Sequence, residues 1–303
     1  MPNSKEIQEL QNKEENLIIQ AAAGHYYNIA EYLNYACWIL CIISIVVSFT
    51  DGDVSIVALC IIDAIATLCR YLLSFYTKRA ADMRLLFDSR VIIGSDNNIS
   101  LHERRNLIET AIKYSKLFKN QCKQQISNSG SNNPPGKKDW YTFNTVCGFP
   151  KAQIVCFEQN NLFKKKIMKL GYLVVAVLHF LACGIITLIV LYSGLSITAA
   201  VVINAIYIFI MRYGERVYQH WKYHNVSLQS ETMIGFVREQ PTEEGILKCL
   251  QFLNEYRHIP VFGSSLIHRF TVKDIESVYR KVLESEKEYT TMAIYYLENK
   301  TSA

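Results

Sequence analysis

The chain has 303 residues and a formal net charge of +5, and 50% of its residues are hydrophobic while 19% are charged. The hydrophobic residues gather in four runs of about 18–23 residues, each long enough to cross a hydrocarbon core of about 30 Å. This distribution excludes a single soluble globular domain. Five of the nine cysteines lie inside the runs and the others form no CxxC pair, so neither a disulfide framework nor a metal site is expected.

The four runs cover residues 33–50, 54–74, 170–192 and 195–213 and form two closely spaced pairs. Backbone polar groups inside hydrocarbon must be satisfied within the segment, so each run is predicted to be a helix and each pair a helical hairpin. The short turns within the pairs hold no Lys or Arg, whereas basic residues flank the opposite ends. The positive-inside rule therefore predicts an all-α, multi-pass membrane protein with both termini in the cytoplasm.

This prediction divides the chain into five parts. They are an N-terminal cytoplasmic amphipathic helix (1–32), a transmembrane hairpin (33–76), a basic cytoplasmic domain (77–169), a second transmembrane hairpin (170–214) and a C-terminal cytoplasmic helical region (215–303). Residues 77–168 hold sixteen basic and seven acidic side chains, so the positive charge is local to the centre of the chain. Some of it lies beside the bilayer, where Arg84 is expected to contact anionic headgroups.

Few polar side chains interrupt the runs. Asp63, His179 and Asn204 lie near the middle of the second, third and fourth runs, about 13 Å deep at about 1.5 Å per residue. A charged carboxylate at that depth is expected to face protein or water rather than lipid. Two interpretations remain open: an interhelical hydrogen bond such as Asp63 to His179, or a polar ring that lines or gates a pore. Arg70 lies near the cytoplasmic edge, so it is expected to reach the headgroups and has no predicted pore role.

Capping residues predict helices in the water-soluble parts. Ser100 with Glu103 forms a capping box ahead of an amphipathic helix that is expected to reach Cys122. Thr242 is expected to cap a helix that ends before Ile259, and Thr271 to cap a further one.

A flexible loop at residues 127–138 runs into a cluster of cations and aromatic rings. The loop is not a nucleotide-hydrolysing phosphate loop, because its glycine spacing is wrong and Lys138 stands where Ser or Thr should hold Mg²⁺. Cations beside aromatic rings suit an anionic ligand that carries a base, whereas a tryptophan packed in a small core beside solvated lysines is the structural alternative. The candidate ligand residues are Arg104, Arg105, Lys137, Lys138, Trp140 and Tyr141.

No catalytic motif is present: the sequence lacks HExxH, GxSxG and GxGxxG, so the chain is not expected to be an enzyme or to hold a cofactor or metal.

Several weak motifs occur together along nearly the whole chain. They are Gln11, Asn12, Leu17, Gln20, Ala21, Ala22, residues 26–31, Phe87, Asp88, Val91, Asn98, Asp139, Trp140, Tyr141, Cys156, Gln159, Asn160, Lys166, Tyr172, Leu228, Gln229 and residues 257–260. In this order the chain resembles the SMODS-associating four-transmembrane pore-forming effectors, which accompany bacterial nucleotidyltransferases in cyclic-oligonucleotide anti-phage defence (CBASS). It departs from the family at residues 95–97, where a tryptophan is expected, and at residues 162–164, where a tryptophan–aspartate pair is expected.

The resemblance implies a resting protein in the bacterial inner membrane, functionally linked to a cyclic-nucleotide synthase. A cyclic di- or oligonucleotide, rather than a nucleic acid polymer, would bind the cytoplasmic region and trigger membrane permeabilisation. Four helices packed 8–10 Å apart fill their own centre, so a pore requires a homo-oligomer within the lipid bilayer. The alternative is a constitutive ion channel or transporter subunit with a regulatory cytoplasmic domain.

Overall fold

The structure is a computed structural model that describes residues 1–48, 53–130, 132–143, 145–161 and 199–260, together with positions 177, 180, 181 and 184. Side chains are described in these ranges except at residues 53–56, 199–211 and 213. Every element of the described part is helical, as the all-α prediction requires. Apart from those four positions, the third hydrophobic run, with His179, lies outside the described residues, as does the helix expected after Thr271.

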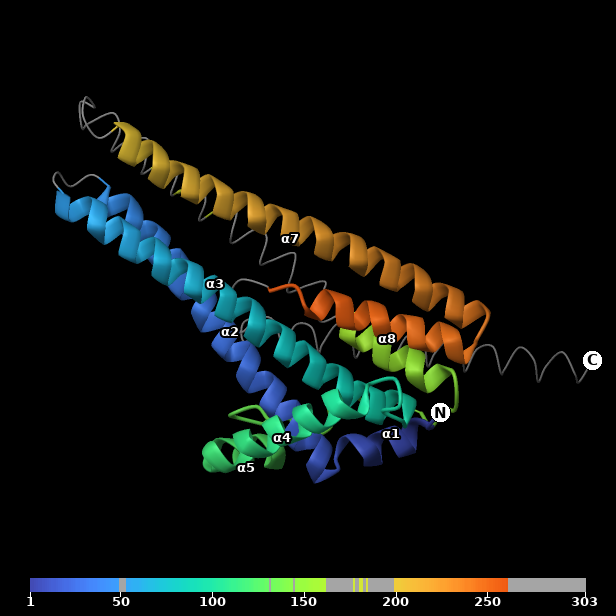
Figure 1. The fold of residues 1–303 in the computed structure, drawn as a ribbon. Helices are drawn as coiled ribbons and strands as arrows, with labels where there is room; N and C mark the ends of the chain where they lie inside the picture. Colours follow the sequence, from blue (N-terminus) through green and yellow to red (C-terminus); the bar gives the residue numbers. More distant parts are fainter. Residues whose placement is uncertain are drawn as a thin grey trace, which may run out of the picture.

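Three long helices dominate the molecule: α2 (Glu14–Val47), α3 (Asp53–Asp88) and α7 (Ala199–Glu239) (Figure 1). They contain 34, 36 and 41 residues. At about 1.5 Å per residue each is longer than about 50 Å, well beyond a hydrocarbon core of about 30 Å. Each helix therefore extends well past its hydrophobic run. In particular, α2 continues through residues 32 and 33, so the predicted N-terminal helix and first membrane helix are one element.

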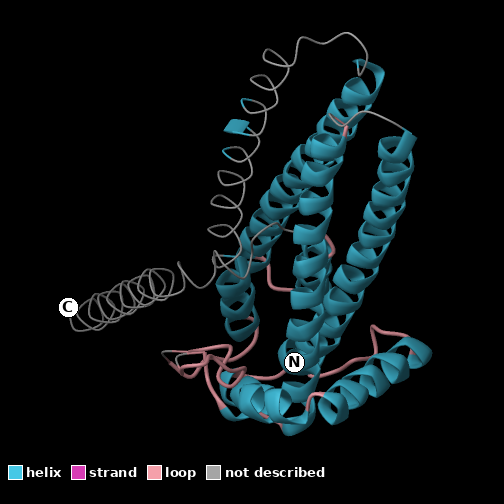
Figure 2. Cartoon of the chain, turned by 90° about the vertical axis from the view of Figure 1, so that its left-hand side faces the viewer, coloured by secondary structure: helices cyan, strands magenta, loops and turns pink. Residues whose placement is uncertain are grey.

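Helices α2 and α3 pack side by side in antiparallel fashion (Figures 1 and 2). Near one end Tyr26 stacks on Tyr76 with ring centroids 5.7 Å apart, and further along the pair the Cys37 thiol lies 3.9 Å from the Ala66 carbonyl oxygen. Both helices are candidate membrane spans by length and hydropathy.

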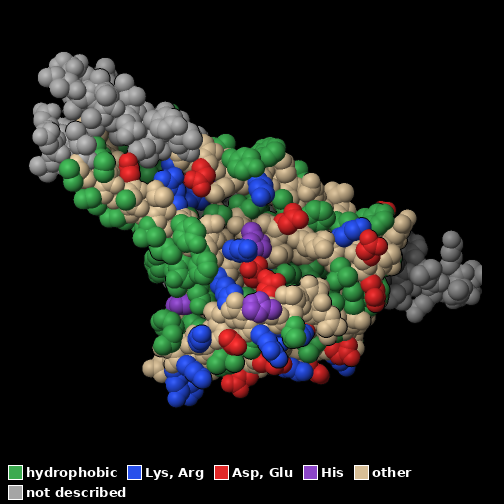
Figure 3. Space-filling view, in the orientation of Figure 1, with side chains coloured by type: hydrophobic (Ala, Val, Ile, Leu, Met, Phe, Trp, Pro, Cys, Tyr) green, Lys and Arg blue, Asp and Glu red, His purple; other side chains and the backbone are tan. Residues whose placement is uncertain are grey.

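The two ends of these helices differ in chemistry (Figure 3). Toward the α2–α3 turn large hydrophobic side chains remain exposed. Only 6% of the most apolar 18-residue stretch of α3 is buried. Examples are Ile39, Ile42, Val46, Val57, Ile61 and Leu68, all more than half exposed. Such a surface suits lipid better than water. We call this part the apolar end.

The opposite end, which we call the polar end, holds a closed hydrophobic core. It contains α1 (Ser4–Gln11), α4 (Leu101–Leu117), α5 (Lys119–Ser127), α8 (Glu243–Arg257) and a π-helical segment, η1 (Ser89–Ile93), directly after α3. Helical residues 151–161 and the last part of α7 pack there as well. Buried members come from most of these elements; they include Ile7, Ala21, Phe87, Leu107, Phe157, Tyr223 and Leu250.

Local capping chemistry explains several helix boundaries. Ser100 accepts a hydrogen bond from the Glu103 N–H, and Thr242 accepts one from the Gly245 N–H, which confirms both predicted helix starts. The helix after Ser100 does not continue to Cys122, because the backbone of Phe118 leaves helical geometry and divides it into α4 and α5. The Phe118 ring packs 4.4 Å from the imidazole of His25 on α2.

The N-terminal segment also forms two helices where the sequence predicted one. Helix α1 ends at Gln11 and α2 begins at Glu14. The break at Asn12 has a tertiary cause: its side-chain amide donates to the Asp139 carboxylate (2.8 Å) and its side-chain oxygen accepts from the Asp139 N–H (3.1 Å). Residues far apart in sequence are thereby joined at the polar end.

Candidate functional site

A buried polar network lies where α3 passes into η1. The Asp88 side chain is fully buried and forms an ion pair with Arg257 of α8, which is itself 3% exposed. The Tyr141 hydroxyl donates to Asp88 Oδ1 (2.8 Å) and accepts from the Asn160 side-chain amide (2.9 Å). Arg257 also donates to Asn160 Oδ1 (3.2 Å). Each side chain of this set therefore hydrogen-bonds or forms an ion pair with another, as buried charged groups require. We call these four residues the Asp88 network.

The surroundings of the network shift the pKa values of Tyr141 and Arg257. Burial raises the pKa of Tyr141, and the neighbouring Asp88 carboxylate raises it further. Burial alone would lower the pKa of Arg257, but the Asp88 charge and the tyrosine hydroxyls outweigh burial and raise it. Asp88 is therefore paired with an arginine that stays charged, next to a phenol that stays protonated.

Helix α1 is tied to the same network through the backbone of Tyr141. The Gln11 side chain donates to the Tyr141 carbonyl oxygen (3.0 Å) and accepts from its N–H (2.7 Å). Asp139 has a left-handed backbone (φ 53°), which the Asn12 contacts hold in place. The chain around Trp140 is therefore fixed on both sides.

Next to this network, two cations lie against the Trp140 ring. The Arg84 guanidinium lies 4.4 Å from the ring centroid and the Lys137 ammonium 6.0 Å from it. Arg84 Nη1 donates to the Gln20 side-chain oxygen (2.6 Å) in the amide orientation that satisfies both groups. We call Arg84, Lys137 and Trp140 the cation–aromatic cluster; it lies on the polar ends of α2 and α3.

The cluster has unused capacity for an anion. Arg84 is 8% exposed, its Nε lies 3.8 Å from Asp88, and its Nη2 has no hydrogen-bond partner in the part of the chain that the structure describes. Within that same part Lys137 Nζ has no carboxylate within 4 Å. Burial lowers the pKa of Lys137, and the positive charge of Arg84 lowers it further, to about 8. Two desolvated like charges side by side favour a bound anion.

The loop at residues 127–138 places Lys137 by backbone hydrogen bonds. The Gly136 N–H donates to the Ser129 carbonyl oxygen (2.8 Å), and the Lys137 N–H donates to the Gln125 carbonyl oxygen (2.8 Å). Lys137 then points toward α2, where a Cβ atom built on Gly24 would lie 3.2 Å from Nζ. Lys138, the next residue, is exposed.

Replacing Gly136 by alanine is expected to displace this loop. A Cβ atom at Gly136 would overlap the backbone carbonyl of Asn128, which cannot move without breaking the loop's own hydrogen bonds. We expect limited proteolysis to cut the variant within residues 127–138 faster than the wild type. Gly130, where a Cβ atom meets nothing within 4 Å, supplies the matched control in Gly130→Ala. Equal cleavage rates would contradict this role of Gly136.

The structure separates the six residues predicted to bind ligand. Lys137 and Trp140 lie together in the cation–aromatic cluster. Tyr141 is 1% exposed and belongs to the Asp88 network. Arg104 forms an ion pair with Asp96, which also accepts from Arg90 (2.9 Å). Lys138 and Arg105 are exposed.

The ion pair with Asp96 gives Arg104 a structural role. Burial alone would raise the pKa of Asp96, but the hydrogen bonds from Arg90 and Arg104 outweigh burial and lower it. Arg104 therefore holds the segment after η1 against α4. Arg104 and Tyr141 thus each bind a carboxylate of the protein itself, Asp96 and Asp88 respectively.

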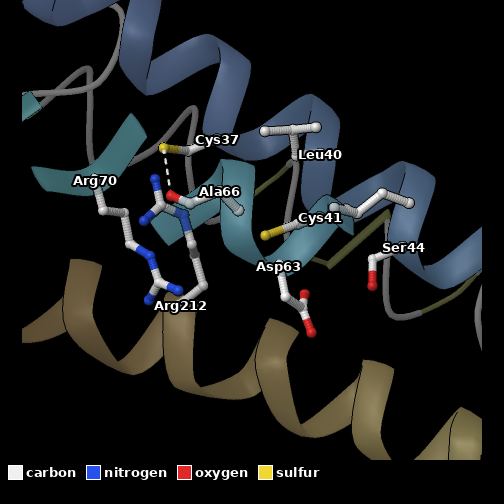
Figure 4. A pocket seen from close by; sticks show the side chains of 9 residues that line it. Cys37, Leu40, Cys41, Ser44, Asp63, Ala66, Arg70 and Arg212 are labelled. Atoms are coloured by element: carbon white, nitrogen blue, oxygen red, sulfur yellow. Dashed lines mark hydrogen bonds between the residues drawn. The ribbon is translucent and has the colours of Figure 1, made fainter. Parts of the chain in front are cut away.

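Of the three predicted pore residues, the structure describes the side chain of one, Asp63. Asp63, on α3, lines a small cavity between α2, α3 and α7 (Figure 4). Asn204 belongs to α7, although its side chain is outside the description, as is all of His179. Two arginines that the sequence did not assign to a pore, Arg70 and Arg212, line the same cavity.

Sequence reasoning missed Arg84 and Arg257 as site residues. Arg84 was assigned to lipid headgroups because it follows a hydrophobic run, yet its guanidinium lies against Trp140 and also 4.9 Å from the Phe87 ring. A signal was present: Gln11, Gln20, Asp88, Trp140, Tyr141, Asn160 and Arg257 are among the residues that carry the family resemblance. The structure brings all seven to one place at the polar end. Among the described residues, no group of three or more His, Cys, Asp or Glu side chains could hold a metal ion.

One comparison with known proteins identifies a family for the chain. No curated protein and no solved structure matches the chain. The family model of the SMODS-associating 4TM effector domain matches residues 5–207, which include the cation–aromatic cluster and most of the Asp88 network. The match covers about two thirds of the chain. The chain therefore belongs to the SMODS-associating 4TM effector domain family.

Proposed function

We propose that this four-transmembrane effector is a ligand-gated, pore-forming protein of the bacterial inner membrane. Its polar end lies in the cytoplasm and binds a cyclic di- or oligonucleotide made by a partner synthase. Binding drives several chains to assemble and permeabilise the membrane, which arrests growth or kills the infected cell. The basic residues that flank the hydrophobic runs support this placement of the polar end in the cytoplasm.

One observation carries the proposal: the cation–aromatic cluster contacts the same helices that form the apolar end, through Arg84 itself and its hydrogen bond to Gln20. Arg84 is on α3 and Gln20 on α2, and both helices continue without interruption into their candidate membrane spans. A cyclic nucleotide offers phosphates for Arg84 and Lys137, and bases that stack on aromatic or guanidinium planes. A ligand bound there acts directly on the membrane helices.

The Asp88 network gives binding a route to the rest of the polar end. Arg84 Nε lies 3.8 Å from Asp88, so an anion that draws Arg84 toward itself weakens this contact. Asp88 in turn forms an ion pair with Arg257 of α8 and accepts a hydrogen bond from Tyr141, which follows the 127–138 loop. Ligand binding and rearrangement of α8 against α3 are thereby coupled in this proposal.

Expression in cells tests the proposed function against a constitutive channel. We expect the chain alone to leave the membrane potential unchanged, as read by a voltage-sensitive dye. Co-expression with an active cyclic-nucleotide synthase should collapse the potential, whereas an inactive synthase should not. Depolarisation without any synthase would favour the constitutive channel and contradict the proposal.

Ligand affinity is expected to depend on pH through Lys137. Its pKa of about 8 means that Lys137 is mostly charged at pH 7 and mostly neutral at pH 9. Affinity for a cyclic dinucleotide should therefore fall as the pH rises from 7 to 9, as measured by calorimetric titration in detergent. In Lys137→Arg, whose side chain stays charged, affinity should change little over this range. An equal decline in both proteins would contradict the assignment.

A further inference from the structure

The cavity between α2, α3 and α7 includes three charged side chains in its lining although it lies within the apolar end. It is lined by Cys37, Leu40, Cys41, Ser44, Ile62, Asp63, Ala66, Arg70 and Arg212 (Figure 4). Its volume is about 10 Å³, close to the least that holds one water molecule. Burying charged side chains in such a place costs free energy, so their presence points to a function.

Arg212 is the buried charged side chain of this cavity that lacks hydrogen bonds to the described residues. It reaches from α7 toward α2 and α3 and is 3% exposed, yet none of its three guanidinium nitrogens has a hydrogen-bond partner in the part of the chain described here (Figure 4). The nearest carboxylate oxygen recorded for it, on the 42% exposed side chain of Glu215, lies 3.5 Å from Nη1. A buried cation without hydrogen bonds requires water or an anion as soon as either can enter.

Arg70 adds a second positive charge on the facing helix. Its side chain extends from α3 toward α7, and it forms no ion pair with any residue in the described ranges (Figure 4). It lies about 6 Å inside the polar edge of the 54–74 run, at about 1.5 Å per residue. Arg70 therefore faces the cavity, whereas the sequence suggested that it only reaches the headgroups.

Among the described side chains, Asp63 is the only carboxylate that lines this cavity, and neither arginine comes within 4 Å of it. The described lining, with two arginines and one aspartate, carries one formal net positive charge per chain. In an assembly each chain contributes this set, and rings of side chains with one sign of charge select ions of the opposite sign.

We infer that Arg70 and Arg212 line the path that ions take through the opened assembly and make it prefer anions to cations. This inference rests on the pore function proposed above and adds its ion selectivity. Separation of α7 from α2 and α3 widens the cavity, hydrates Arg212 and supplies the hydrogen bonds that the closed chain lacks. Asp63 opposes the preference and keeps it moderate.

The test is a planar lipid bilayer that contains the full chain, with a tenfold KCl gradient and a mixture of cyclic di- and trinucleotides as the trigger. The reversal potential gives the chloride-to-potassium permeability ratio. For the wild type we expect a ratio of about 3 or more. Arg212→Gln and Arg70→Gln should each lower the ratio toward 1, and Asp63→Asn should raise it. Lys248→Gln, which removes an exposed charge on α8, should leave it unchanged.

The outcomes distinguish this inference from the function on which it rests. A triggered conductance that prefers potassium, or one whose ratio is unaltered in both arginine variants, overturns the inference and leaves pore formation standing. A wild-type protein that never conducts contradicts the proposed function itself. Because Arg70 is exposed, Arg70→Gln is expected to fold even if Arg212→Gln does not.

Discussion

Replacing Asp88 by asparagine is expected to lower the free energy of unfolding by about 3–5 kcal/mol, because it leaves a buried arginine charge without its partner. Asp88 is fully buried and Arg257 is 3% exposed, so water cannot replace the lost carboxylate. Asparagine keeps the size of the side chain and an acceptor for the Tyr141 hydroxyl. The decrease in the free energy of unfolding therefore measures the effect of removing the negative charge. Denaturant unfolding in detergent micelles measures it.

Two further variants separate charge burial from general damage. Asp82→Asn removes a carboxylate from the same helix; its partner His258 is partly exposed, so we expect a loss below about 1 kcal/mol. The double variant Asp88→Asn with Arg257→Gln removes both charges, and we expect the two effects to couple by more than about 1 kcal/mol. Additive effects, or an equal loss in Asp82→Asn, would show that the Asp88–Arg257 pair does not hold the polar end together.

Removing the two cations beside Trp140 is expected to have the largest effect on ligand binding. A hydrogen bond to a charged group contributes about 1.5–3 kcal/mol, so Arg84→Gln and Lys137→Gln should each weaken cyclic-nucleotide affinity by about 10- to 100-fold. The double variant should bind no ligand in the range where the wild type saturates. Equilibrium dialysis with radiolabelled cyclic dinucleotides provides the measurement.

The matched control for these variants is Lys248→Gln. Lys248 is an exposed cation of the polar end, paired with Glu244 on α8 at 2.8 Å, and it is expected to contribute little to stability or binding. Salt should weaken ligand binding by the wild type more than binding by either single variant, because only the wild type presents both charges to the phosphates. Unchanged affinity in both single variants would place the ligand elsewhere on the molecule.

The sequence was sufficient for features that depend on neighbouring residues. Hydrophobic runs predicted the candidate membrane spans in α2 and α3, and the Ser100 and Thr242 caps predicted the starts of α4 and α8. These signals extend over one helix or one turn, so no tertiary information is required.

The site could not be assembled from sequence because its contacts are long-range. Asp88 meets Tyr141 and Arg257 across 53 and 169 residues. Lys137 and Lys138 are equivalent in the sequence, and only the fold of their loop turns one toward Trp140 and leaves the other exposed. Arg84 looked like a headgroup contact because its distance from the hydrophobic run was known, whereas the direction of its side chain was not.

Dye release from liposomes that contain the purified chain tests most directly whether a ligand at the cation–aromatic cluster opens the membrane. Each cyclic di- or trinucleotide is added separately to wild-type, Lys137→Gln and Lys248→Gln proteins. We predict that one compound releases dye from wild-type and Lys248→Gln liposomes at similar concentrations, and from Lys137→Gln liposomes only at concentrations about 10- to 100-fold higher. Release without any nucleotide, or with the same concentration dependence in all three proteins, would contradict the account.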